Sequence, residues 1–239
     1  MVERFSASVA SRHMACHASA DLETAIPGWV PPVEDPEADN AANQGTIKHA
    51  LFAKVMELGT RDLEKFSEAV SYIATLRQTR RFKVLIEAPI TANWLTTRPG
   101  TTADLVLYTQ DELHIIDLKT GKIPVSPVEN KQLMYYAVSY GHLAPRAKGA
   151  TLHIVQPWAD NMVGWFADTA HLQLFMMEAQ AAEHAIQRGD RTFGPSNSCQ
   201  FCPANPHGRG QKGSPLCPVL MDMYYPKIVD EAAILTLGD

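Results

Sequence analysis

The chain has 239 residues, of which 46% are hydrophobic and 20% charged, enough for one core of ordinary size with appendages. Its formal net charge of −5 excludes binding of a nucleic acid through an overall positive charge. Any contact with a nucleic acid would have to be made by a local basic patch. No apolar run approaches the roughly 20 residues that span a bilayer, and the N-terminus lacks the apolar segment of a signal peptide. We therefore expect no membrane partner, a cytoplasmic location, and cysteines that are thiols or metal ligands rather than disulfides.

Helices and an acidic loop are predicted in the first part of the chain. Residues 6–25 predict a short helix with Cys16 near its end. Residues 27–45, rich in Pro, Asp, Glu and Asn, predict an irregular loop. The apolar spacing that follows predicts a helix that has Thr46 as its N-cap and stops at Gly59.

Strands dominate the middle of the chain. After a second helix over 60–79, β-rich runs follow at 83–90, 103–109 and 112–120. The Pro-, Gly- and Asp-rich segments between them predict hairpin turns.

A helix, a strand and a long helix complete the predicted core. Ser126 and Glu129 predict a capping box, with Pro127 at the first helical position. Another strand is expected at 150–157, followed by a helix over roughly 168–188. This order of elements predicts an α+β or α/β core with a mixed sheet.

An acid and a lysine share one face of the third predicted strand. Side chains alternate across a strand, so Asp117 and Lys119 point the same way while Leu118 points away. Asp104, at the start of the preceding strand, offers a second carboxylate. Two carboxylates on adjacent strands can hold Mg²⁺ or Mn²⁺, and a lysine beside the ion can stabilise charge on a phosphate. The residues thus indicate phosphodiester hydrolysis, with a structural ion pair as the alternative.

Four short motifs, in this order, resemble the RecB-like branch of the PD-(D/E)xK nuclease superfamily. They are "GTIKH", "GTTAD", "DLK" and, in "NKQLMYYA", a glutamine and a tyrosine four residues apart. Ala103 stands where the superfamily often has proline. The resemblance implies an α/β (α+β) fold with a restriction-endonuclease-like core, in which helices flank a mixed β-sheet.

The resemblance also implies roles for individual residues. Asp104 and Asp117 would be metal ligands, the Leu118 carbonyl a further ligand, and Lys119 the catalytic lysine. His49 would be an additional ligand, as in exonuclease-type members, although a helix histidine on its own is more often structural. The implied cofactor is Mg²⁺ or Mn²⁺.

Further residues are expected to contact the substrate or to support the ligands. Gln132 and Tyr136 share one helix face and can reach the site, although ordinary helix surface explains them too. Tyr135 competes for the aromatic role. Glu87, on a neighbouring strand, is expected to be a supporting acid or part of a structural ion pair. Trp94 is expected either to stack on an unpaired base or to lie in the core.

The four cysteines lie towards the two ends of the chain. Cys16 precedes the predicted core, whereas Cys199, Cys202 and Cys217 follow it. The C-x-x-C pair brings two thiolates onto one ion or cluster. This placement resembles the iron–sulfur subgroup of RecB-like nucleases, which includes AddB-type subunits and CRISPR-adaptation exonucleases. It implies a [4Fe–4S] cluster that joins the N- and C-terminal segments.

Zinc is the alternative metal at the cysteines. Fourteen residues separate Cys202 from Cys217, more than is typical of the iron–sulfur subgroup. They include His207, which can take the place of one thiolate in a zinc site. Four thiolates, or three thiolates and His207, would then hold the ion.

The expected layout is a single nuclease domain over residues 1–239. It consists of an N-terminal segment (1–45), a core (46–190) and a cysteine-containing segment (191–239). We expect a metal-dependent DNA nuclease, most simply an exonuclease on single-stranded DNA or DNA ends. Phage-encoded relatives share the "SAS…C" opening, which implies phage DNA recombination, repair or processing in the host cytoplasm, with phage or host recombination proteins as partners. The alternatives are a structure-specific endonuclease and a DNA-binding or assembly module with a structural Fe–S or zinc site.

Overall fold

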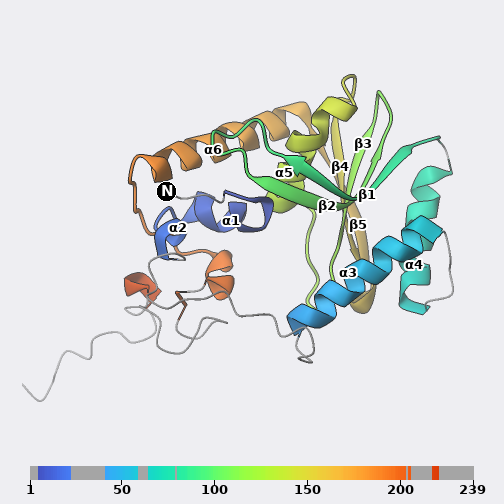
Figure 1. Cartoon of the computed structure of the whole chain (residues 1–239), viewed down its shortest axis with the longest axis horizontal. Helices are drawn as coiled ribbons and strands as arrows, with labels where there is room; N and C mark the ends of the chain where they lie inside the picture. The colour runs from blue at the N-terminus through green and yellow to red at the C-terminus, as the bar shows by residue number, and fades with distance from the viewer. Residues whose placement is uncertain are drawn as a thin grey trace, which may run out of the picture. The chain divides into compact units, whose positions relative to one another are not determined.

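The computed structural model describes six parts of the chain (Figure 1): residues 5–22, 41–58, 64–78, 80–202, 204–205 and 217–220. They fall into two compact units. One unit contains residues 5–11 and 41–183 and carries the sheet; the other contains residues 12–22 and 184–220 and carries the four cysteines. None of the described helices combines the length and apolar character needed to cross a bilayer.

A five-stranded mixed sheet forms the centre of the larger unit. Its strands follow chain order: β1 (Lys83–Thr91), β2 (Gly100–Tyr108), β3 (Leu113–Leu118), β4 (Gly149–Gln156) and β5 (Asn161–Asp168). Neighbouring strands are antiparallel except β3 and β4, which are parallel. The mixed sheet and its first four strands agree with the sequence-based prediction. The fifth strand was not predicted.

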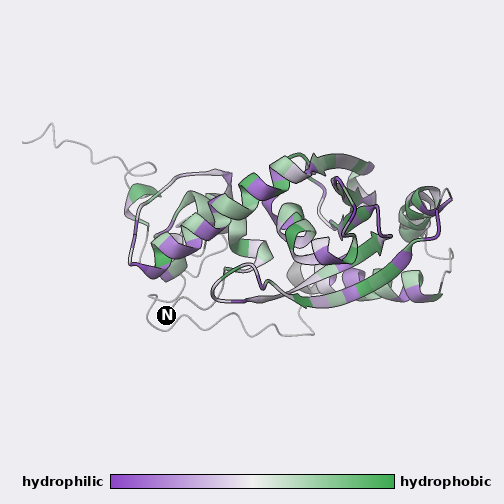
Figure 2. Cartoon of the chain, turned by 90° about the horizontal axis from the view of Figure 1, so that it is seen from above, coloured by the Kyte–Doolittle hydropathy of each residue, from purple (hydrophilic) through white to green (hydrophobic). Residues whose placement is uncertain are grey.

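Helices cover both faces of this sheet, with α3 and α4 on one side and α5 and α6 on the other (Figure 1). They are α3 (Ala41–Leu58), α4 (Glu64–Arg77), α5 (Lys131–Tyr140) and α6 (Thr169–Gln187). Phe52 and Ile73 pack with Leu105 and Ile116 in the core between α3, α4 and the sheet. Figure 2 shows hydrophobic colour along the strands, and alternating hydrophobic and hydrophilic residues along α6.

Two predicted helix starts were wrong. The third helix begins at Ala41, so residues 41–45 are helical rather than a loop, and Thr46 lies inside the helix instead of capping it. The capping box at Ser126 is also absent. Asn130 caps α5, and its side chain accepts a hydrogen bond from the Leu133 amide at 3.2 Å. Glu129 precedes this cap with a left-handed backbone (φ 52°).

The smaller unit brings the segment around Cys16 beside the segment that follows α6. The predicted helix over 6–25 is interrupted at Cys16, because α1 (Ala7–Ala15) ends there and α2 (Ser19–Leu22) begins three residues later. The Ala18 amide donates to the Thr192 carbonyl at 3.2 Å, and His17 Nδ1 lies 2.9 Å from Asp190 Oδ2. The rest of the acidic loop and residues 23–25, 59–63 and 79 lie outside the described residues.

Candidate functional site

The strands β2 and β3 separate at the point where the two acids lie. Their pairing ends with Leu105 opposite Ile116, and beyond it β3 pairs only with β4. The next residue on each strand is an aspartate, Asp104 and Asp117. The Leu118 amide donates to Asp104 Oδ2 at 2.7 Å instead of to a carbonyl of β2. Both aspartates therefore lie at the point where the two strands part.

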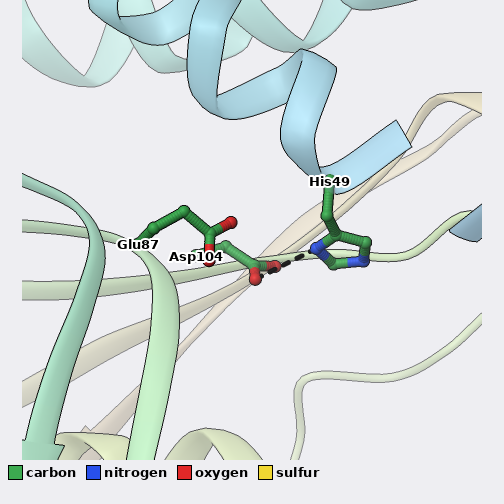
Figure 3. A group of neighbouring side chains, drawn as sticks. All are labelled: His49, Glu87 and Asp104. Carbon is green, nitrogen blue, oxygen red and sulfur yellow. Dashed lines mark hydrogen bonds and ion pairs between the residues drawn. The ribbon is translucent and has the colours of Figure 1, made fainter. Parts of the chain in front are cut away.

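Three side chains from three elements, Asp104 among them, lie close together (Figure 3). His49 from α3, Glu87 from β1 and Asp104 from β2 each place one ligand atom within 4.8 Å of the others. His49 Nδ1 lies 3.1 Å from Asp104 Oδ1. The hydrogen bond with Asp104 raises the pKa of His49 against the opposing effect of burial. One imidazole and two carboxylates suit Mn²⁺ or Mg²⁺.

Glu87 reaches this group through an unusual backbone conformation. Its φ is 44°, in the left-handed region that non-glycine residues seldom adopt, and the β1–β2 register skips it. Such a conformation costs of order 1–3 kcal/mol and is often found at functional sites. Partial burial raises the pKa of Glu87, and the negative charge of Asp104 raises it further. A cation between these carboxylates would relieve this repulsion.

A second chain of contacts begins at Asp117 and leads to α5. Lys119 Nζ lies 2.7 Å from Asp117 Oδ2 and donates to Gln132 Oε1 at 2.8 Å. Gln132 Nε2 donates in turn to the Tyr136 hydroxyl at 3.2 Å. The Asp117 side chain is buried, and this burial raises its pKa even though the Lys119 charge opposes the shift. The lysine is thus fixed from two sides, beside a carboxylate that water does not solvate.

The two groups bring together the side chains that the sequence predicted as metal ligands, catalytic lysine and substrate contacts. His49 and Asp104 join with Glu87, which the sequence suggested only as a supporting acid. Asp117 faces Lys119 and lies outside the 4.8 Å group. Leu118 contacts Asp104 through its amide, not through the carbonyl that was predicted as a further ligand.

Two aromatic residues considered from the sequence lie in the core instead. The Tyr135 hydroxyl donates to the Phe5 carbonyl at 3.0 Å, so Tyr136 is the tyrosine of the site. Trp94 packs against Tyr135 and Phe175, and its indole donates to Ser139 Oγ at 3.0 Å. Trp94 therefore has a packing role.

All four cysteines lie in the smaller unit, and all are free thiols. Cys16, Cys199 and Cys217 line one small cavity of about 10 Å³. Burial raises the pKa of the Cys202 thiol, and the nearby Cys16 and Cys217 thiols add to this effect. Four thiols from four points in the chain are thus gathered in one place.

The spacing of these thiols is wider than that of a preformed zinc site. Tetrahedral zinc with Zn–S bonds of about 2.3 Å places its sulfur atoms roughly 3.8 Å apart. Among the described residues, the cysteines do not form a group whose ligand atoms all lie within 4.8 Å of one another. The donor set fits a soft metal centre, and a single zinc ion would require the thiols to move closer together.

Comparisons with known proteins give structural likenesses and a family. The crystal structure of SSO0001 covers 81% of this chain and 81% of its own chain, with 14% sequence identity and a TM-score of 0.45. At this level the likeness does not establish a shared fold. Residues 64–237 match the family described as "Protein of unknown function (DUF2800)", a range that includes Glu87, Asp104, Asp117 and Lys119. The chain therefore belongs to the DUF2800 family.

Proposed function

We propose that this protein is a metal-dependent DNA nuclease with a PD-(D/E)xK core of the RecB-like type. Its expected substrate is single-stranded DNA or the ends of DNA. The observation that carries the proposal is the arrangement of two aspartates where β2 and β3 separate. Asp104 joins His49 and Glu87 in a set of two carboxylates and one imidazole, and Asp117 holds Lys119 beside it.

Different side chains of the site would bind the metal ion and stabilise the phosphate. His49, Glu87 and Asp104 would hold Mg²⁺ or Mn²⁺, with Asp117 adjacent. When bound, the ion supplies Lewis-acid stabilisation of the phosphate and lowers the pKa of a water molecule. Lys119 presents a fixed positive charge that can stabilise the phosphate oxygens in the transition state.

Two residues of α5 support the lysine. Gln132 accepts a hydrogen bond from Lys119 Nζ, and Tyr136 accepts one from the Gln132 amide. Burial raises the pKa of the Tyr136 hydroxyl and keeps it neutral, and the charge of Asp117 adds to this effect. These contacts restrict the lysine to one position, which is the condition for electrostatic preorganisation.

The cysteines form the second part of the proposal. Cys16, Cys199, Cys202 and Cys217 would ligate a [4Fe–4S] cluster, with zinc as the alternative. The gathering of all four thiols in the smaller unit supports a shared metal centre, and their placement before and after the core, which resembles the iron–sulfur subgroup, favours the cluster.

A cleavage assay tests the nuclease. Anaerobically purified protein is incubated with end-labelled single- and double-stranded DNA in Mg²⁺, in Mn²⁺ and with chelator. We expect cleavage that needs the metal and falls at least about a hundredfold in Lys119→Ala. Lys54→Ala is the matched control, because Lys54 is an exposed lysine that pairs only with nearby Glu57 on the same helix. DNA binding without cleavage in either metal would instead support a binding or assembly module.

A further inference from the structure

The segment that follows Lys119 is held in place by a buried glutamine. Gln156, on β4, is fully buried. Its Nε2 donates to the carbonyls of Gly121 at 2.9 Å and Ile123 at 2.8 Å, and its Oε1 accepts from the Val125 amide at 3.0 Å. A buried side-chain amide with three backbone partners fixes a loop much as a strand pairing would.

A second side chain supports the same loop from β5. Asn161 Nδ2 donates to the Val125 carbonyl at 2.9 Å and to Gln156 Oε1 at 2.9 Å. The loop therefore has a defined backbone on the side that faces the sheet.

This fixed loop presents an apolar side chain to solvent. Ile123 is 82% exposed, the most exposed large hydrophobic residue among those described, and the neighbouring Lys122 is exposed as well. Ile123 lies four residues after Lys119, so its backbone is at most about 14 Å from that of the lysine. A loop that is held in this way and presents an isoleucine to solvent within this distance of the site can contact what the site binds.

The first half of α3 lies against this loop and has the same character. A Cβ on Gly45 would lie 3.5 Å from Thr120 Oγ1, so the helix and the loop are in contact. Ile47 is 56% exposed. Lys48 Nζ lies 4.6 Å from the centre of the Trp158 ring.

We infer that Ile47, Lys48, Lys122 and Ile123 form a strand-binding rim that receives an unpaired nucleic-acid strand beside the site. This inference rests on the proposed function, because it names the substrate form that this site would take. Within the described part of the chain, no carboxylate forms an ion pair with Lys48 or Lys122. Both lysines are therefore available to phosphates.

The apolar members of the rim specify an unpaired strand. Single-strand binding combines cations that follow the backbone with side chains that contact the faces of the bases. Those faces are covered in a stacked duplex, so the exposed Ile47 and Ile123 gain apolar contact only with an unpaired strand or with a frayed end. A duplex would contact the lysines alone.

Binding can be measured apart from cleavage. The probe is a fluorescein-labelled DNA strand of about 16 nucleotides, followed by fluorescence anisotropy with the full-length Lys119→Ala protein. Added to this background, Ile123→Ser and Lys122→Ser should each weaken binding about tenfold, and Asn161→Ala should weaken it by loosening the loop. Val128→Ser is the matched control, because Val128 is 55% exposed in the same connection but lies beyond the held loop.

The outcomes separate this inference from the proposed function. Unchanged binding in Ile123→Ser and Lys122→Ser, or an equal loss in Val128→Ser, overturns the rim whether or not the parent cleaves DNA. Equal affinity for a blunt duplex of the same sequence overturns the preference for an unpaired strand. Strand binding that depends on Ile123, in a protein that cleaves nothing in any metal, supports the rim while the nuclease proposal fails. An RNA strand of the same sequence tests whether the rim distinguishes the sugar.

Discussion

Asp104 bonds to the Leu118 amide through one carboxylate oxygen and faces His49 through the other, at 2.7 Å and 3.1 Å. The first contact replaces a main-chain acceptor where β2 and β3 separate, and the second belongs to the candidate metal group. One side chain thus maintains the opening between the strands and also contributes a ligand to it. These two roles can be separated by substitution.

Asp104→Asn should leave the fold intact and remove metal binding. The amide oxygen of asparagine can still accept from Leu118, but it carries no charge for the cation or for His49. We expect unchanged thermal unfolding without metal, and at least tenfold weaker Mn²⁺ binding by calorimetry. Asp160→Asn is the control, because Asp160 is exposed and its left-handed backbone (φ 46°) suits asparagine. Parental affinity for Mn²⁺ in Asp104→Asn would exclude the aspartate as a ligand.

His49→Ala should reduce Mn²⁺-supported activity more than Mg²⁺-supported activity. Imidazole is a softer ligand than carboxylate and favours transition metals over Mg²⁺. Initial cleavage rates in the two metals provide the measurement, with His142→Ala as control because His142 is exposed and contacts only the Ser139 carbonyl. If the ratio of the two rates stays the same, His49 has a structural role alone.

The strands β1 to β4 could be predicted because their signals are local. Apolar runs bounded by turn residues mark them, and β2, β3 and β4 each contain several buried residues. The last strand could not be predicted in this way. β5 is an edge strand in which only Ala167 is buried, while Val163 and Phe166 are exposed, so the alternation that marks a strand is missing.

Other features depend on contacts that are distant in sequence. Residues 41–45 resemble a loop because Asn and Gly are poor helix formers, yet α3 runs through Gly45. The helix passes close to Thr120 at this glycine, a contact that only the folded chain reveals. The positive φ of Glu87 likewise has no sequence signal, so its approach to Asp104 and His49 was not predictable.

Acid should destabilise the larger unit through His153. This histidine is 2% exposed and lies between the Tyr72 hydroxyl, at 2.8 Å, and His114, at 3.0 Å, with Gly164 opposite. Burial, with a smaller effect from His114, lowers the pKa of His153 from 6.5 to about 3. Between these values the unfolded chain binds more protons, so this part of the stability is complete above pH 6.5 and is lost as the pH falls towards 3.

Replacing His153 isolates its contribution to the pH dependence of the free energy of unfolding. A tenfold difference in proton affinity corresponds to about 1.4 kcal/mol. His153→Gln should be less stable at pH 7 and should lose less stability between pH 6.5 and 4, as measured by urea unfolding. His142→Gln, on the surface, should follow the parent. Parallel curves for His153→Gln and the parent would show that His153 is not the group responsible.

Gly194→Ala should destabilise the cysteine-containing unit. A Cβ at Gly194 would overlap the carbonyl oxygen of Ala15, next to Cys16, so one of the two backbones must move. Overpacking of this kind costs about 1–3 kcal/mol. Gly141→Ala is the control, because nothing lies within 4 Å of its Cβ position. Differential scanning calorimetry should show a lower Tm for Gly194→Ala alone; equal Tm values would mean that the chain relaxes there without cost.

Each of the four cysteines should be needed for a metal centre that stabilises the smaller unit. Ligation would close a loop of about 180 residues between Cys16 and Cys199, and loop-closure entropy grows with length. Every Cys→Ser variant should therefore lower the Tm by about 5 °C or more and reduce the bound iron, while Ser198→Ala should do neither. Because the sheet residues lie in the other unit, Mn²⁺ binding at His49 and Asp104 should survive in these variants.

The identity of the metal follows from the purified protein itself. Anaerobic preparations should be brown, with about four irons and four acid-labile sulfides per chain, as the resemblance to the iron–sulfur subgroup implies. One zinc per chain in a colourless protein would replace the cluster with a zinc site, for which the thiols must move closer together. A protein with neither metal, whose Cys→Ser variants unfold like the parent, would leave the four thiols as ordinary packing residues.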